Sequence, residues 1–191
     1  MNDLYDGPIS VSFLGDVEAQ KLAEILHINQ NVTSLSLCLN KIGKEGAHAL
    51  AKALHVNHTL TSFDISCNQI GDVGAQSISQ ALQVNHTLTS LNLSDNQITD
   101  VGAQTLFNAL QFNHGLTSLD LSHNHFTHIL LRFNHHLNSL NLQCTNIDIH
   151  DLSIALQVNH GLTSLDLSGN HIVYIYKNMF IYQEKSQLVL V

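Results

Sequence analysis

The segment LTSLNLSDNQITDVGAQTLFNALQFNHG, residues 88–115, closely resembles the segment before it, LTSFDISCNQIGDVGAQSISQALQVNHT, residues 60–87. Both begin with an apolar pattern of the form L-x-x-L-x-L-x-x-N-x-I. The first residues of the successive units are Val32, Leu60, Leu88, Leu116, Leu137 and Leu162. The intervals between them are 28, 28, 28, 21 and 25 residues. A period of about 20 to 50 residues is typical of a solenoid of stacked repeats.

Each unit predicts one strand followed by one helix. In SLNLS, Leu91 and Leu93 alternate with polar residues, which is the period of a half-buried strand. In DVGAQTLFNAL, apolar residues such as Ala103 and Leu106 fall at helical spacing, and Asp100 is placed to cap the helix start. Because a returning helix follows every strand, the strands must be parallel. The sequence therefore predicts an α/β solenoid with a parallel sheet.

Two sets of asparagines recur along the chain. The first set follows the strands and consists of Asn40, Asn68, Asn96, Asn124 and Asn170. A stacked ladder of amide side chains both donates and accepts, so it can pair the backbone groups of the turns. Thr145 interrupts this ladder, and we expect a weak seam there. The second set follows the helices or their shortened counterpart and is predicted to stop them in a left-handed conformation: Asn57, Asn85, Asn113, Asn134 and Asn159.

The period predicts a single domain over residues 1–191. Its expected parts are a degenerate N-terminal cap repeat at 4–31, repeats at 32–59, 60–87, 88–115, 116–136 and 137–161, and a C-terminal cap at 162–191. The unit 116–136 lacks seven residues of the helical half, so a full helix will not fit. The final residues QLVLV alternate like one further strand.

Units of 28 residues with a GAxxLxxAL helix resemble the ribonuclease-inhibitor-like class of leucine-rich repeats (LRRs), over roughly residues 16–172. The resemblance implies a curved solenoid, a horseshoe or arc, with strands on the concave face and helices on the convex face. It also implies a non-enzymatic scaffold for protein–protein interaction. The similar repeats with NHT or NHG linkers resemble, more loosely, LRR effectors that intracellular bacterial pathogens inject into host cells.

Composition restricts the partners and the compartment. The formal net charge is −8, and no Lys or Arg occurs between Lys52 and Arg132, so we do not expect nucleic acid as a partner. Three cysteines without a C-x-x-C pair indicate a reducing compartment. The N-terminus lacks the pattern of a secretory signal, and HIVYIYKNMFIY is too short to span a membrane. We expect a cytoplasmic monomer with no membrane partner. As an effector it would be delivered into a host cytosol without a cleavable signal peptide.

The concave face is the expected binding surface, because the residue between the two inward apolar residues of each strand must point outward. These outward residues are small, polar and mildly acidic, which indicates either a weak binder of a basic protein partner or mostly family consensus. The resemblance to bacterial effectors implies that such a partner is host-derived. We predict the following binding residues: Asp64, Asn92, Asp95, Asp120, His123, Asn141 and Asp166.

Two other chemistries deserve comparison with this prediction. Asp95, His123 and Cys144 occupy one column on three consecutive repeats, and a thiol beside an imidazole and a carboxylate would form an activated hydrolase nucleophile. Nothing in the sequence supplies a pocket or an oxyanion hole, so we favour a variable surface position and predict no enzyme activity.

A metal site built from histidines is the second alternative. Five of them lie in the shortened repeat and would suit a metal ion if they converged: His123, His125, His128, His135 and His136. The linker histidines His58, His86, His114 and His160 are explained by duplication of the repeat, and we predict neither a metal site nor a cofactor. A third hypothesis is that the chain is a structural or ligand-sensing part of a larger LRR protein.

Overall fold

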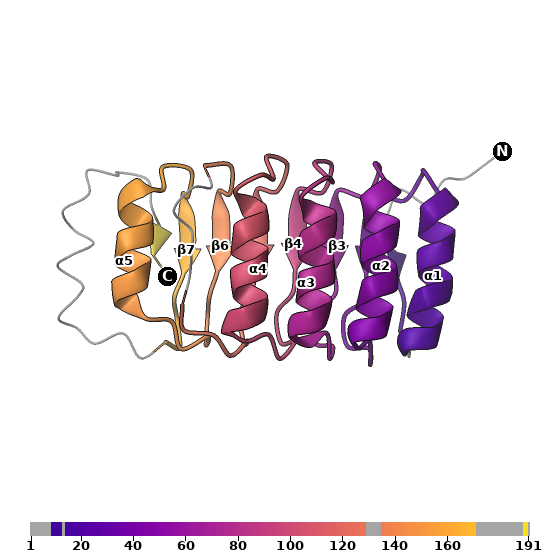
Figure 1. Ribbon diagram of the computed structural model, residues 1–191, viewed down its shortest axis with the longest axis horizontal. Coiled ribbons are helices and arrows are strands. Elements are labelled where there is room, and N and C mark those ends of the chain that lie inside the picture. The colour runs from indigo at the N-terminus through magenta and orange to yellow at the C-terminus, as the bar shows by residue number, and fades with distance from the viewer. Residues whose placement is uncertain (1–8, 13, 129–134, 171–188, 191) are drawn as a thin grey trace.

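The computed structural model of the chain describes residues 9–12, 14–128, 135–170 and 189–190. Strands and helices alternate along the chain and form two layers, with the helices side by side on one face of the sheet (Figure 1). The N-terminal helix lies at one end of the row and the last described helix near the other (Figure 1). This arrangement confirms the predicted α/β LRR solenoid, with strands on its concave face and helices on its convex face.

The described strands form one parallel sheet in chain order. They are β1 (Ile9–Ser10), β2 (Ser34–Ser36), β3 (Ser62–Asp64), β4 (Ser90–Asn92), β5 (Ser118–Asp120), β6 (Ser139–Asn141), β7 (Ser164–Asp166) and β8 (Val189–Leu190). The helices are α1 (Asp16–Ile28), α2 (Lys44–Val56), α3 (Gly71–Leu82), α4 (Asp100–Leu110) and α5 (Ile149–Val158). The strand predicted in the final residues is therefore present, and it pairs with β7.

The core lies between the two layers and follows from the two apolar periods. The central residue of each strand from β2 to β7 is buried, while its two neighbours remain partly exposed on the other face. The register places equivalent residues side by side, as Phe63, Leu91 and Leu119 show. Ala103 and Leu106 of α4 are completely buried against these strands. The predicted inward residues of strand and helix are thus confirmed.

The shortened unit lacks an α-helix between β5 and β6 among the described residues. Residues 129–134, which include much of its predicted irregular half, lie outside the described part. Near this position the ring of Phe107 meets the ring of Phe126 edge-on, with centroids 6.3 Å apart. Earlier repeats carry the small residues Ala51 and Ser79 at the position of Phe107. Aromatic side chains thus fill the core where the chain is shorter.

The first asparagine ladder links the turns that follow the strands. Asn96 donates from Nδ2 to the carbonyl oxygen of Ile65 in the preceding repeat at 2.9 Å, and to that of Leu93 in its own repeat at 3.2 Å. The Oδ1 atom of Asn124 accepts from the backbone N–H of Ile98 in the preceding repeat at 2.9 Å. Each rung therefore pairs backbone groups that the curving strand leaves without a sheet partner.

Thr145 occupies the ladder position in the unit after the shortened one. Its hydroxyl donates to the carbonyl oxygen of Leu142 in its own turn at 2.9 Å and lies 3.3 Å from Asn170 Oδ1 of the next unit. In the described chain its side chain makes no hydrogen bond to the preceding unit. A hydroxyl has a single hydrogen to donate, so it cannot repeat the several bonds of an amide.

The second asparagine set forms another ladder, beside the N-terminal ends of the strands, whereas the first ladder follows their C-terminal ends. Asn85 donates from Nδ2 to the carbonyl oxygens of Leu54 and Asn57 in the preceding repeat, at 2.6 and 2.8 Å. Its Oδ1 accepts from the N–H groups of Thr87 and Leu88, at 3.0 and 2.9 Å, where the next strand segment begins. Asn113 repeats the donor bonds one unit later.

The predicted left-handed conformation of this second set is wrong. Asn57 and Asn159 end α2 and α5 with φ of −82° and −84°, in the extended region. Asn134 lies outside the described residues. An extended backbone lets the side chain reach the preceding repeat while its own strand begins. Positive φ instead marks the column that precedes the first ladder: Leu39, Cys67, Asp95, His123, Cys144 and Gly169.

The predicted role of Asp100 also needs correction. The start of α4 has no side-chain cap from its own repeat. Asp72 supplies it from the preceding repeat, where its Oδ1 accepts from the N–H groups of Thr99 and Gly102 at 2.8 and 3.0 Å. Asp100 in turn accepts from the N–H of Thr127 in the next unit at 2.7 Å. A carboxylate close to several unpaired amides at a helix start is favourable, and here it joins two repeats.

Candidate functional site

The outward residues of the strands form the candidate site on the concave face. Asp64, Asp120 and Asp166 occupy the last positions of β3, β5 and β7, and each is partly exposed. Asn92 and Asn141 end β4 and β6 between them. Register pairing aligns these side chains across the sheet, so they form one column, called here the acidic column, together with Ser36.

Each member from Asp64 onward also closes a local turn, a role that the sequence analysis missed. The Oδ1 of Asp64 accepts from the N–H of Ser66 at 3.0 Å, and that of Asp120 accepts from the N–H of Ser122 at 2.9 Å. Asn92 makes the same bond through its amide oxygen. Asp or Asn with a hydrogen bond to the backbone two residues on defines an Asx turn. The repeated D-x-S and N-x-S segments were the available sequence signal.

Hydrogen bonds between strands use some of the remaining carboxylate oxygens. Ser36 donates from Oγ to Asp64 Oδ2 at 3.0 Å, and Asn141 donates from Nδ2 to Asp120 Oδ2 at 3.0 Å. Within the described chain, Asp166 accepts only through Oδ1, from the N–H of Ser168. The acidic column therefore keeps its negative charge in a fixed orientation, held partly by its own neighbours. It suits a cationic ligand that approaches from the concave side.

Asp95 and His123 lie just outside the acidic column. Both are exposed and both have positive φ, as does the partly exposed Cys144. No hydrogen bond joins these three side chains in the described structure. The thiol, imidazole and carboxylate therefore occupy one column without the contacts that would activate a nucleophile.

Cys67, rather than Cys144, is the thiol that interacts with Asp95. Burial raises the pKa of Cys67, and the nearby Cys38 and Asp95 raise it further. A raised pKa reduces the thiolate fraction at neutral pH, which is the opposite of what a cysteine nucleophile requires. All three cysteines of the chain are free thiols.

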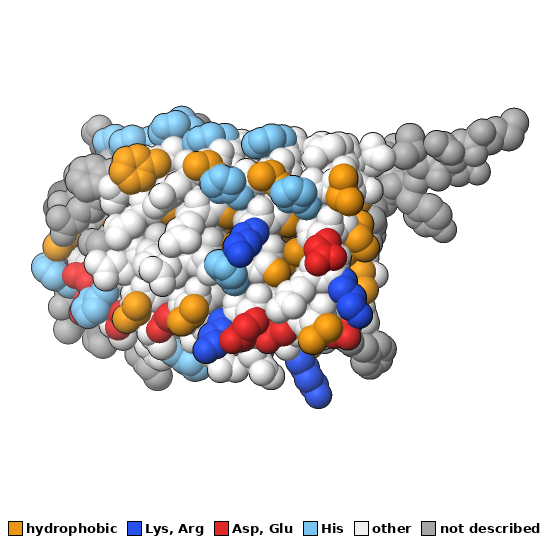
Figure 2. Space-filling model, turned by 45° about the vertical axis from the view of Figure 1, so that its right-hand side comes forward, with side chains coloured by type: hydrophobic (Ala, Val, Ile, Leu, Met, Phe, Trp, Pro, Cys, Tyr) orange, Lys and Arg blue, Asp and Glu red, His pale blue; other side chains and the backbone are white. Residues whose placement is uncertain are grey.

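The linker histidines form a row along the edge of the second asparagine ladder. The rings of His86 and His114 are stacked with centroids 6.1 Å apart, and those of His114 and His136 are 4.5 Å apart. His135 and His160 stack at 6.2 Å. Figure 2 shows histidine side chains along this edge. Repetition of the unit thus places successive imidazoles beside one another.

The histidines of the shortened repeat do not converge. His123, His125 and His128 are all exposed. No group of three or more potential metal ligands is found among the described residues. The structure places His135 and His136 in the edge row instead.

His128 forms the closest charged contact of the described chain. Its Nδ1 lies 2.6 Å from Asp151 Oδ2 of α5, and this hydrogen bond raises the pKa of His128. Burial acts to raise the pKa of Asp100, but hydrogen bonds from the N–H groups of His128 and Thr127 outweigh it and lower that pKa. The shortened unit is therefore connected electrostatically to the helices on both sides.

None of the described helices has the length and apolar character needed to cross a bilayer. Stacked strand–helix units with a polar strand face define a solenoid repeat protein. Family models described as "Leucine Rich repeat" match residues 29–51, 56–79, 84–107 and 158–172, and a related one matches residues 115–135. The chain is a member of the leucine-rich-repeat family.

Solved structures of similar proteins agree with this assignment. The actin-binding site 2 of leiomodin-1 matches with 26% identity and a TM-score of 0.58, over 65% of this chain and 73% of that one. The tropomodulin C-terminal domain of Caenorhabditis elegans shares the fold at 12% identity and a TM-score of 0.56, over 63% of this chain and 76% of that one. No curated protein sequence matches significantly.

An internalin of Listeria monocytogenes also has this fold. It matches 90% of this chain at 24% identity with a TM-score of 0.56. The chain spans 49% of the length of that internalin.

Proposed function

We propose that the chain is a non-enzymatic scaffold that binds another protein through its concave face. The observation that carries the proposal is the acidic column, in which Asp64, Asp120 and Asp166 are aligned across the sheet by strand pairing. Leiomodin-1, similar in structure over 65% of the chain, contains an actin-binding site, which supports a protein as the class of ligand.

The partner that suits this face carries Lys or Arg side chains. Each strand step is about 4.8 Å, so the carboxylates of Asp64 and Asp120, two strands apart, are separated by about 10 Å. Asn92 lies between them as a neutral hydrogen-bonding group. A basic segment that crosses the strands would contact all three aspartates in turn. Electrostatic complementarity of this kind increases both specificity and association rate.

The repeat class, the compartment, the oligomeric state and the biological role are also part of this proposal. The 28-residue unit with helices of 12 or 13 residues, as in α3 and α2, supports the ribonuclease-inhibitor-like class. The three free thiols support a reducing compartment such as a cytosol. We propose that the chain acts there as a monomer. The NHT and NHG linkers support a role as a bacterial effector that binds a host-derived protein.

Capture of partners on matched variants tests this function. The triple variant D64N/D120N/D166N removes three charges but keeps an acceptor oxygen to close each turn, as the amide oxygens of Asn92 and Asn141 do in neighbouring strands. Proteins from a host lysate that bind the wild-type chain and not the triple variant are identified by mass spectrometry. Equal retention of every captured protein by both chains would contradict the concave-face proposal.

A further inference from the structure

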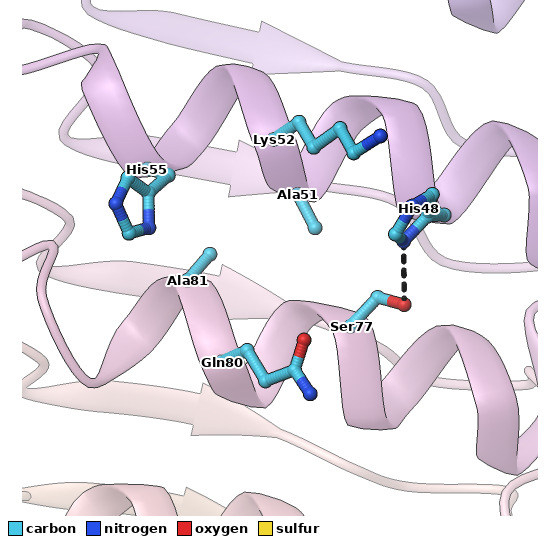
Figure 3. Close-up of a pocket in the computed structure, with 7 residues that line it drawn as sticks. All are labelled: His48, Ala51, Lys52, His55, Ser77, Gln80 and Ala81. Carbon is cyan, nitrogen blue, oxygen red and sulfur yellow. Dashed lines mark hydrogen bonds between the residues drawn. The ribbon is translucent and has the colours of Figure 1, made fainter.

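The groove between α2 and α3 on the convex face has the opposite charge character from the concave face. It has a volume of about 170 Å³ and is lined by His48, Lys52 and His55 from α2 and by Ser77 and Gln80 from α3 (Figure 3). None of the described residues that line it is acidic. Its three basic side chains contrast with the formal net charge of −8 of the whole chain.

Helical spacing brings the three basic side chains to one face of α2. His48, Lys52 and His55 are separated by four and three residues, so they lie on one side of the helix over about 10 Å. Small side chains form the floor, because Ala51 and Ala81 point into the space between the helices (Figure 3). The groove is therefore open to solvent, and it runs along the axes of the two helices.

The polar groups of α3 complete the set of hydrogen-bond donors. Ser77 Oγ lies 3.2 Å from His48 Nδ1, which holds one end of the groove in place. Gln80 points toward α2 between the two ends (Figure 3). The Ser77 hydroxyl donates to the carbonyl oxygen of Val73 at 3.2 Å, so the amide, the ammonium and the two imidazoles are the groups that suit an acceptor-rich ligand.

The charges that surround Lys52 leave it available. In the described chain Lys52 makes no ion pair, whereas Lys44 pairs with Glu45 at 3.7 Å. Lys52 also lines the neighbouring groove between α1 and α2, which has a volume of about 420 Å³, together with Glu24 and His27 of α1. From α3 only neutral groups face it. The negative charge of Glu24 makes the α1–α2 groove less suited to an anion than the α2–α3 groove.

Repetition supplies an internal comparison. One repeat later, α3 carries glutamines at all three equivalent positions: Gln76, Gln80 and Gln83 correspond to His48, Lys52 and His55. Because glutamine serves equally well in a helix of the same solenoid, the packing of the helices does not require basic residues on α2. The basic side chains therefore need an explanation beyond the fold.

We propose that the α2–α3 groove binds an acidic segment of a partner protein through Lys52, His48 and His55. A segment is favoured over a single small anion because the basic groups extend over about 10 Å, which is about three residues of an extended peptide. Carboxylates spaced along such a segment contact successive basic groups. The solenoid then has docking surfaces of opposite charge on its two faces.

Fluorescence anisotropy with a labelled oligoglutamate peptide measures this binding on the full chain at an ionic strength of about 0.15 M, where charges more than about 8 Å apart are largely screened. An oligoglutamine peptide of the same length serves as the neutral probe. The expected result is saturable binding of oligoglutamate and none of oligoglutamine. Absence of saturable oligoglutamate binding would overturn the proposal.

Two triple variants locate the site. H48Q/K52Q/H55Q places in α2 the side chains that α3 already has, so the fold should be retained, and binding should weaken by about tenfold or more. K21Q/K41Q/K44Q removes three lysines outside the groove and should leave the affinity within about twofold. Equal losses in the two variants would show a general charge effect and overturn the assignment.

The acidic column of a second copy is the alternative occupant. Sedimentation of the wild-type chain alone distinguishes it. Concentration-dependent self-association that H48Q/K52Q/H55Q abolishes would assign the groove to a second copy and overturn the assignment to a different partner.

Discussion

The carboxylate of Asp72 accepts a hydrogen bond from the backbone N–H of Gly102, one repeat further along the chain, at 3.0 Å. A Cβ atom at Gly102 would lie 2.6 Å from the same carboxylate oxygen, so only glycine admits this contact. The start of α4 is thus capped by the repeat before it. Stability in this solenoid comes from polar contacts between repeats as well as from the apolar core.

Replacement of Asp72 by Ala should destabilise the chain by about 1 kcal/mol, the usual cost of losing a helix cap. Asp72→Asn keeps an acceptor oxygen and should lose less. Urea unfolding followed by circular dichroism measures both. Gln104→Ala, an exposed change on α4, is the control and should leave stability within about 0.5 kcal/mol. A Gln104→Ala loss as large as that of Asp72→Ala would contradict the capping role.

Thr145→Asn should stabilise the chain, by up to about 1 kcal/mol, because an amide can add a hydrogen bond to the preceding unit that the hydroxyl does not make. Asn96→Thr, the reverse exchange in an intact rung, should destabilise by on the order of 2 kcal/mol, since it leaves buried carbonyl groups unpaired. Urea unfolding measures both variants. If Thr145→Asn leaves the free energy of unfolding unchanged or lowers it, the missing amide does not limit stability here, and the shortened backbone does.

His128 should titrate above the ordinary histidine value of about 6.5, because the hydrogen bond to Asp151 favours its charged form. A group whose pKa is raised by folding stabilises the fold below its unfolded pKa, and this contribution disappears as the pH rises through the folded pKa. NMR titration of the His128 ring in the wild type and in Asp151→Asn checks the cause. The Asp151→Asn chain should show a lower pKa at His128; an unchanged value would show that Asp151 is not responsible.

The electric field of the whole molecule should reverse in mildly acidic solution. The formal net charge is −8 with neutral histidines, and protonation of all fourteen would change it to +6. Because the sequence pI is about 5.9, electrophoretic mobility should change sign between neutral pH and about pH 5. A mobility that stays anodic down to that pH would contradict this expectation.

The architecture was predictable because its determinants are local and repeated. Leu91 and Leu93 show the strand period, Ala103 and Leu106 the helical one, and equal spacing of the units indicates that each stacks on its equivalent. Asp100 was interpreted as a cap for its own helix because single-helix rules consider one repeat at a time. Its true partners lie about one repeat away in the next unit.

The candidate site was predictable in position and not in detail. Alternation along each strand placed Asp64 and Asp120 on the outer face, but their bonds to Ser66 and Ser122 depend on how each strand ends. The basic groove, with His48, Lys52 and His55, was missed because the repeats were compared along their strands and linkers and not along the exposed faces of their helices. Comparison with the equivalent glutamines of the next repeat would have indicated it.

The concave-face account predicts a specific pattern of affinities for a captured basic partner. Each single variant, Asp64→Asn, Asp120→Asn or Asp166→Asn, should weaken binding by about 1 kcal/mol, or roughly fivefold. The triple variant should weaken it by roughly a hundredfold, with a smaller dependence on salt.

The most direct test is an isothermal titration of this partner into the wild-type chain, the triple Asn variant and a convex-face control, Gln76→Ala with Gln104→Ala. Gln76 and Gln104 are exposed on α3 and α4, away from the strands. The account predicts a large loss of affinity in the triple variant and wild-type affinity in the control. Wild-type affinity in the triple variant, together with lost binding in the control, would contradict the concave-face account.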